Sequence, residues 1–157
     1  MNTVVIGVGN TYRGDDAAGL AAARELSELV PEGVSVLTTE QEPSRLLDAW
    51  AGANVAILVD AASSGDAPGA VKRFDASVDP IPAGVFRSST HAFGVGDAIE
   101  MARALGTLPE RVVVYAIEAE RFELGAPLSP RAAVGVERVV EAVLEDIKEE
   151  QCTSAPS

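Results

Sequence analysis

The chain contains short apolar runs separated by polar turns, and each run has the length of a β-strand. Residues 3–8 are apolar at nearly every position, without the alternation of a half-exposed strand. Continuous β-branched runs of this kind are typical of central strands in a parallel sheet, which are buried on both faces. The pattern predicts strands at 3–8, 34–38, 55–59 and 111–117, and a short edge strand at 70–74.

Between the predicted strands, apolar residues recur every three or four positions, as they do on one face of a helix. These residues are Ala18, Ala22, Leu26 and Leu29 in a helix that begins at Asp15; Leu46, Leu47 and Trp50 at 43–50; Val95, Ile99, Ala102 and Leu105 in a helix that follows His91; and Val136, Val139, Val140, Val143, Leu144 and Ile147 near the end. Ser129 and Pro130 predict the start of the last helix, because serine caps free amides and proline suits the first helical position.

Strands that alternate with helices predict a single α/β domain. We expect a mostly parallel, twisted sheet of about five strands, with helices on both faces. The domain is expected to span 1–148, followed by a flexible polar tail at 149–157, and residues 75–90 are expected to be irregular. Right-handed crossovers place the carboxyl ends of parallel strands along one edge of the sheet, where such folds bind ligands.

The charge balance argues against two classes of partner. The 157 residues include 24 acidic and 12 basic side chains, which give a formal net charge of −12. Nucleic acids and anionic membrane surfaces both require a positive face, so neither is expected to bind. The chain has one cysteine, Cys152, and no basic leader segment, so we expect a cytoplasmic protein without disulfides. Nothing in the pattern resembles a dimer seam, and a monomer is expected.

A glycine-rich turn follows the first predicted strand and raises the possibility of a nucleotide site. A dinucleotide-binding turn has a third glycine where this chain has Tyr12, although Glu40 stands where a ribose-binding acid would be. Asp15 and Asp16 begin the next helix, and their charge would repel a bound pyrophosphate. One such acid is commonly a helix cap that complements the helix dipole. The second aspartate is not needed as a cap, and its negative charge favours the binding of a cation at this edge of the sheet.

Two further polar residues are expected at the same edge. Asp60 follows directly after the apolar run 55–59, and His91 lies just before a predicted helix. Taken alone, Asp60 is slightly better explained as a turn-former than as a site residue, and His91 as an ordinary loop residue. Together with Asp16 they provide two carboxylates and one imidazole, a ligand set that suits a borderline divalent cation. Three protein ligands leave further coordination positions free for water or for a partner.

Four segments resemble the hydrogenase maturation proteases, the endopeptidases that process the large subunit of nickel–iron hydrogenases. "GVGNTYRGDDAAG" is similar to the opening motif of that family, and "ILVDAASSG" to the strand that ends in its second acidic position. "STHAFGVGDAIEMA" resembles the segment with its histidine, and "LGAPLSP" the stretch before its last helix. The resemblance extends over roughly Thr3 to Lys148 and includes the order of the segments.

The resemblance implies that Asp16, Asp60 and His91 are the nickel-contacting and catalytic residues. It also implies that the nickel arrives in the precursor of the hydrogenase large subunit, so that no resident cofactor is expected. The protease then removes a C-terminal peptide from that precursor. Many relatives carry a Gly-Gly-Thr-like turn after the second strand, whereas this chain has "LTTEQEPSRLL" there. This difference concerns which hydrogenase is recognised.

Several alternatives remain open at the level of sequence. Asp16 and Asp60 could act as an aspartic-type pair without metal, which would give His91 no evident role and predict cleavage of generic peptides at acid pH. The same three residues could serve a non-enzymatic module that only checks nickel insertion. A cysteine or serine nucleophile is disfavoured, because Cys152 lies in the polar tail and no G-x-S-x-G elbow is present. The acidic residues Glu118, Glu120 and Glu123 are expected to form a solvated rim.

Overall fold

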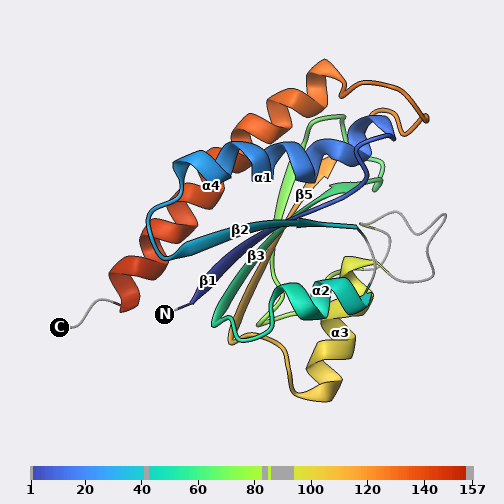
Figure 1. The fold of residues 1–157 in the computed structure, drawn as a ribbon. Helices are drawn as coiled ribbons and strands as arrows, with labels where there is room; N and C mark the ends of the chain where they lie inside the picture. Colours follow the sequence, from blue (N-terminus) through green and yellow to red (C-terminus); the bar gives the residue numbers. More distant parts are fainter. Residues whose placement is uncertain (1, 41–42, 83–84, 86–93, 155–157) are drawn as a thin grey trace.

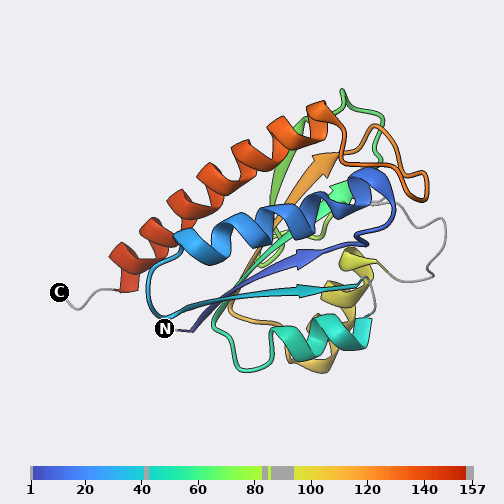
Figure 2. The ribbon, with the colours of Figure 1, turned by 45° about the horizontal axis from the view of Figure 1, so that its top comes forward.

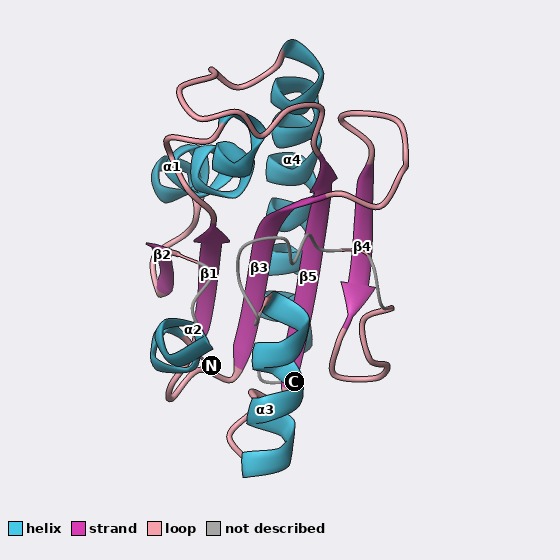
Figure 3. Ribbon diagram, turned by 90° about the vertical axis from the view of Figure 1, so that its right-hand side faces the viewer, coloured by secondary structure: helices cyan, strands magenta, loops and turns pink. Residues whose placement is uncertain are grey.

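The computed structural model describes residues 2–40, 43–82, 85 and 94–154 (Figure 1). Five strands form one sheet in the order β2-β1-β3-β5-β4. The strands are β1 (Thr3–Val8), β2 (Val34–Thr39), β3 (Val55–Ala62), β4 (Val71–Asp75) and β5 (Arg111–Glu118). Pairing is parallel except between β4 and β5, and Figure 3 shows β4 pointing opposite to its neighbours. The expected α/β fold with a mostly parallel five-stranded sheet is confirmed.

The burial of each strand follows its place in the sheet. Every residue of the central strands β1 and β3 is buried, as their continuous apolar sequences predict. The edge strands β2 and β4 have only partly buried and exposed positions. The short strand expected near residues 70–74 is indeed an edge strand.

Helices cover both faces of the sheet (Figures 1 and 2). Ile57 belongs to the apolar cluster shared with α1 and α4, whereas the next residue, Leu58, belongs to the cluster shared with α2 and α3. This alternation follows from the two-residue period of a strand. The helices are α1 (Ala18–Leu29), α2 (Pro43–Ala49), α3 (Val95–Leu105) and α4 (Pro130–Ser154), and a 3₁₀ turn, η1 (Gly14–Ala17), precedes α1.

The predicted helical faces are correct in their centres and wrong at two ends. Ala18, Ala22 and Leu26 are fully buried, but Leu29 and Leu105 are 55% and 65% exposed. Both are the last residues of their helices, where the apolar period continues beyond the packed interface. No helix in the described part of the chain is long and apolar enough to cross a membrane.

Three elements extend further than the sequence predicts. β3 continues past residue 59 to Ala62 because β5, which itself reaches Glu118, pairs with it along that whole length. α4 runs to Ser154, so residues 149–154 of the expected polar tail are helical. The Glu150 carboxylate lies 2.6 Å from the guanidinium of Arg111, at the start of β5. An ion pair to the sheet thus holds the last turns of α4 in place.

Candidate active site

Three glycines let the start of α1 approach the ends of two strands more closely than any side chain permits. A Cβ on Gly9 would lie 2.0 Å from the carbonyl oxygen of Asp16, and one on Gly7 would lie 2.3 Å from that of Gly19. A Cβ on Gly19 would lie 2.3 Å from the carbonyl oxygen of Val59 in β3. The glycine-rich sequence therefore serves close backbone packing, not the approach of a phosphate.

The two adjacent aspartates lie in η1, which is a 3₁₀ turn and not the first turn of the α-helix expected to begin at Asp15. The backbone of Asp16 is fixed on both sides: its carbonyl oxygen accepts from the Asn10 N–H at 3.2 Å, and its own N–H donates to the Arg13 carbonyl at 3.0 Å. Asp16 is half-buried, whereas Asp15 is fully buried. The turn thus separates two chemically identical neighbours into one inner and one outer carboxylate.

The inner carboxylate, Asp15, binds the far end of the chain. Its Oδ2 accepts from the backbone N–H groups of Glu120 and Arg121 at 2.7 and 3.3 Å. Its Oδ1 accepts from the Ser129 N–H at 2.6 Å, and its Oδ2 from the Ser129 hydroxyl at 2.7 Å. Burial alone raises the pKa of Asp15, but these hydrogen bonds outweigh it and hold the pKa below its ordinary value of 3.8.

These contacts change the role expected for Asp15. The sequence suggests a cap for its own helix, yet neither η1 nor α1 has a side-chain cap hydrogen bond. Asp15 instead reaches the start of α4, where Ser129 caps the helix as predicted: its Oγ accepts from the Ala132 N–H at 3.2 Å. One buried carboxylate therefore joins η1, the loop after β5 and the first turn of α4.

Asp60 lies within β3, two residues before its end, and not at the strand terminus that the sequence suggests. It is fully buried, and its Oδ1 accepts from the Ala61 N–H at 2.8 Å. The pairing of β3 with β1 ends at Val59, so Asp60 lies just beyond it, paired with Ala116 of β5 alone. Because Gly19 packs on Val59, η1 and Asp60 lie at the same edge of the sheet.

The third predicted site residue, His91, lies outside the described residues. Val85 is the one described residue between 83 and 93, and it lies near Asp60: its carbonyl oxygen accepts from the Ser63 N–H at 3.1 Å, and its side chain packs on Ala62 and Ala116. No three His, Cys, Asp or Glu side chains within 2–40, 43–82, 85 and 94–154 are placed to hold a metal ion together. The structure brings the segments of Asp16 and Asp60 together. The assignment of His91 to the site rests on the resemblance alone.

Glu118 is not part of a solvated rim, contrary to the expectation from sequence. It is the buried last residue of β5, and its carboxylate accepts from the N–H groups of Ser64 and Asp66 and from the Ser64 hydroxyl. Glu120 and Glu123 are exposed, as expected. Only the pairing of β5 with β3 explains the burial of Glu118, and a single sequence does not reveal that pairing.

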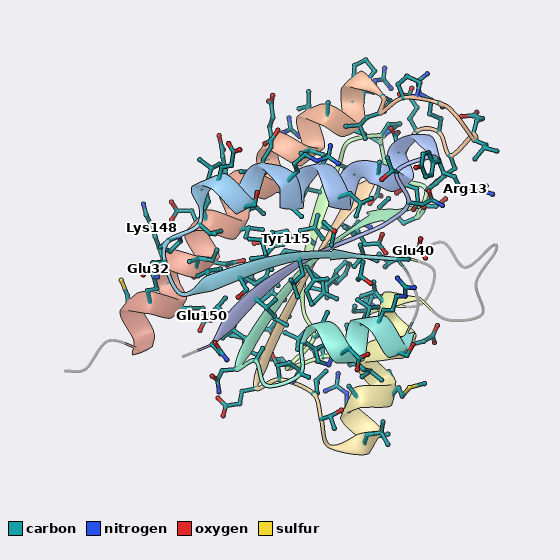
Figure 4. The ribbon with its side chains drawn as sticks, in the orientation of Figure 1. Arg13, Glu32, Glu40, Tyr115, Lys148 and Glu150 are labelled. Atoms are coloured by element: carbon teal, nitrogen blue, oxygen red, sulfur yellow. The ribbon has the colours of Figure 1, made fainter. Side chains whose placement is uncertain are left out.

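The described residues at the opposite end of the molecule supply no alternative site. Cys152 is exposed on α4, near Glu150 and the start of β5. Figure 4 shows Glu150, Glu32 and Lys148 at that end, and Arg13 and Glu40 at the end where η1 lies. Cys152 is thus far removed from the two aspartates, which agrees with its exclusion as a nucleophile.

Comparison with known proteins points to one family. A family model described as hydrogenase maturation protease matches residues 21–146. The chain is 27% identical to the hydrogenase 2 maturation protease of Escherichia coli K12 over 161 residues, which cover 99% of this chain and 96% of that protein. It is 26% identical over 145 residues to the hydrogenase expression/formation protein HupD of Thiocapsa roseopersicina, covering 90% of this chain and 66% of that protein.

Solved structures agree with the sequence relatives. The hydrogenase maturating endopeptidase HybD of E. coli superposes with a TM-score of 0.81 at 25% identity, covering 96% of this chain and 94% of that chain. The nickel–iron hydrogenase maturation protease HycI of Thermococcus kodakarensis KOD1 gives a TM-score of 0.75 at 25% identity, covering 94% and 92%. Matches of sequence and fold extend over nearly the whole chain. The chain belongs to the hydrogenase maturation protease family and is a peptidase.

Proposed function

We propose that this peptidase removes the C-terminal peptide from the precursor of a nickel–iron hydrogenase large subunit, after nickel has been inserted into that precursor. The nickel is part of the substrate, and Asp16, Asp60 and His91 recognise it. The observation that carries the proposal is the convergence of η1 and Asp60 at the carboxyl edge of the sheet. The family membership supplies the substrate class.

The two aspartates suit different parts of this task. Asp16 is half-buried, with its backbone held by Asn10 and Arg13, and it meets an approaching metal first. Asp60 is fully buried, so the substrate must displace the atoms that cover its carboxylate before the two can share one metal ion. Carboxylates together with an imidazole suit a borderline cation such as nickel. The assignment of His91 as that imidazole rests on the resemblance of its segment to the family.

Binding the nickel positions the bond that is cleaved. A water molecule, polarised by the substrate's nickel or by one of the two carboxylates, attacks the carbonyl carbon of the scissile peptide. The peptide bond breaks, and the leaving amine takes up a proton. The metal therefore makes cleavage conditional on a completed nickel site, since a precursor without nickel lacks the group that holds the peptide in place.

The test compares two forms of one substrate. Nickel-loaded and nickel-free large-subunit precursors from the same organism are mixed with the protein, and the mass of each precursor is followed over time. The nickel-loaded precursor is expected to lose its C-terminal peptide, and the nickel-free precursor to stay intact. Equal processing of both would contradict recognition of nickel, and processing of neither would contradict the proposed substrate.

Variants assign the role of Asp16. Asp16→Asn keeps the size of the side chain and removes its charge, and processing is expected to fall by about 100-fold or more. Asp79→Asn is a matched control, because Asp79 is exposed and follows β4, which ends at the opposite edge of the sheet. Equal rates for the two variants would remove Asp16 from the site.

A further inference from the structure

Two large apolar side chains project into solvent beside η1. Tyr12 is 72% exposed and Leu124 is 73% exposed. They come from loops more than 100 residues apart, yet their backbones are joined, because the Gly125 N–H donates to the Tyr12 carbonyl at 2.7 Å. Isolated apolar residues on a surface need no explanation, but two that the fold holds together beside a site do.

Hydrogen bonds of the backbone fix the two loops that carry these side chains. The Tyr12 N–H donates to the Asn10 side chain at 2.9 Å, and the Gly14 N–H donates to the Ala126 carbonyl at 3.1 Å. The Ala126 N–H donates to the Glu123 carbonyl at 3.1 Å, which closes the turn around Leu124. Both loops are further fixed by the buried carboxylate of Asp15. A surface held in advance loses little conformational entropy when it binds a partner.

We infer that Tyr12 and Leu124 form a docking surface for an apolar segment of the large-subunit precursor, next to the bond that is cleaved. This inference rests on the proposed function. Tyr12 lies between Asn10 and Arg13, which both bind the backbone of Asp16, and the Gly125 N–H holds the loop of Leu124 against Tyr12, so the surface adjoins the site. A metal ion identifies a loaded precursor but not its sequence, so the choice of one precursor over others requires contacts of another kind.

A second copy of this chain is a less suitable occupant. A stable interface buries roughly 1,200–2,000 Å² in total, far more than two side chains provide. A peptide segment, in contrast, can be anchored by one or two apolar side chains, and tyrosine is a frequent anchor at such contacts. The segment that docks here belongs to the same molecule that brings nickel to Asp16, and one binding event therefore satisfies both contacts.

The test measures processing of nickel-loaded precursor by Tyr12→Ser and Leu124→Ser. Each variant is expected to raise KM by about tenfold with kcat unchanged, since the contact is equally present in the ground state and the transition state. Leu124→Met keeps the apolar surface and is expected to keep the wild-type KM. Leu105→Ser is the matched control: Leu105 is 65% exposed at the end of α3, on the opposite edge of the sheet.

Three outcomes separate the inference from the proposed function. An unchanged KM in both serine variants, with processing by the wild-type protein intact, would overturn the docking surface alone. A loss of kcat at constant KM would also overturn it, because that pattern indicates a displaced site. No processing by the wild-type protein would overturn the proposed function and the inference together. The melting temperature of each variant is expected to match the wild type, since both side chains lie in solvent.

Discussion

Asp15 and Ser129 are 114 residues apart in the sequence, yet the Asp15 carboxylate accepts two hydrogen bonds from Ser129, one from its N–H at 2.6 Å and one from its hydroxyl at 2.7 Å. Both residues are fully buried. The pair joins the first loop of the chain to its last helix. The backbone next to the candidate site is thus held in place by residues from both ends of the sequence.

Loss of the Asp15 carboxylate is expected to destabilise the fold. Asp15→Ala leaves the two buried donors of Ser129 and the part-buried N–H groups of Glu120 and Arg121 without their acceptor, and unpaired buried groups cost about 1–3 kcal/mol each. We expect the free energy of unfolding to fall by at least about 3 kcal/mol. Urea denaturation followed by circular dichroism measures it.

The neighbouring residue provides the control for this prediction. Asp16 is half-buried, and Asp16→Ala is expected to change the free energy of unfolding by less than about 1 kcal/mol while abolishing processing. Together the two variants separate the structural aspartate from the one proposed to meet the substrate. A larger loss of stability in Asp16→Ala than in Asp15→Ala would contradict this division.

Ser129→Ala is expected to have a composite effect. The substitution removes the N-cap of α4, which accounts for about 1–2 kcal/mol, and one of the donors to Asp15. Ser129→Thr keeps the hydroxyl and is expected to recover part of the loss. Amide hydrogen exchange in the first turn of α4 locates the effect, and unchanged protection there in Ser129→Ala would contradict it.

The close approach at Gly19 predicts opposite effects for two glycine substitutions in helices. In Gly19→Ala the new methyl group would lie 2.3 Å from the Val59 oxygen and 2.4 Å from the Val8 oxygen, and such overpacking costs about 1–3 kcal/mol. In Gly96→Ala, within α3, no atom of the described residues beyond the adjacent helix backbone lies within 4 Å of the new methyl group, and alanine is expected to stabilise the helix by about 0.5–1 kcal/mol. Melting temperatures distinguish the two, and equal shifts would contradict the packing argument.

Tyr115 predicts how stability depends on alkaline pH. Burial raises the pKa of the Tyr115 hydroxyl well above its ordinary value of 10.0, and the hydrogen bond to Asp146 raises it further. The folded protein thus retains a proton that the unfolded chain releases. The resulting stability is fully present below pH 10 and is lost as the pH rises through the folded pKa.

Urea denaturation between pH 8 and pH 11 tests this dependence. The free energy of unfolding of the wild-type protein is expected to decline above pH 10, and that of Tyr115→Phe to decline less. At neutral pH the variant loses two part-buried hydrogen bonds, one to Asp146 and one from Arg73, which cost about 1 kcal/mol each. Arg73 continues to bind Asp146 in the variant, at 3.0 Å, so that carboxylate keeps a partner. Parallel pH profiles for the two proteins would exclude Tyr115 as the cause.

Local sequence patterns are sufficient to predict which helices and strands form. Pairing between strands that are distant in the sequence determines where those elements end. The apolar run 3–8 is β1 residue for residue, and the Ser129 and Pro130 pair marks the start of α4. The extension of β3 through Asp60 depends on β5, which lies about 50 residues further along the chain. No periodicity within one segment contains that information.

The sequence places Asp15, Asp16 and Asp60 at one edge of the sheet, but it does not predict the division of roles between Asp15 and Asp16. Asp15 and Asp16 are indistinguishable as neighbours in a sequence, and only the 3₁₀ turn places one inside and the other at the surface. The partner of Asp15 comes from the last helix, and only the fold brings it near. The exposure of Tyr12 and Leu124 was equally hidden, because a loop sequence has no periodicity that separates packed from exposed apolar residues.

The connection between η1 and α4 also restricts when the enzyme can become active during its synthesis. A chain that has left the ribosome only as far as β5 already contains both aspartates, but it has no Ser129 to receive the inner carboxylate. That charge stays in water, and the loops on either side of the outer aspartate are not yet fixed. The surroundings of the outer aspartate are therefore completed only when the last helix is in place.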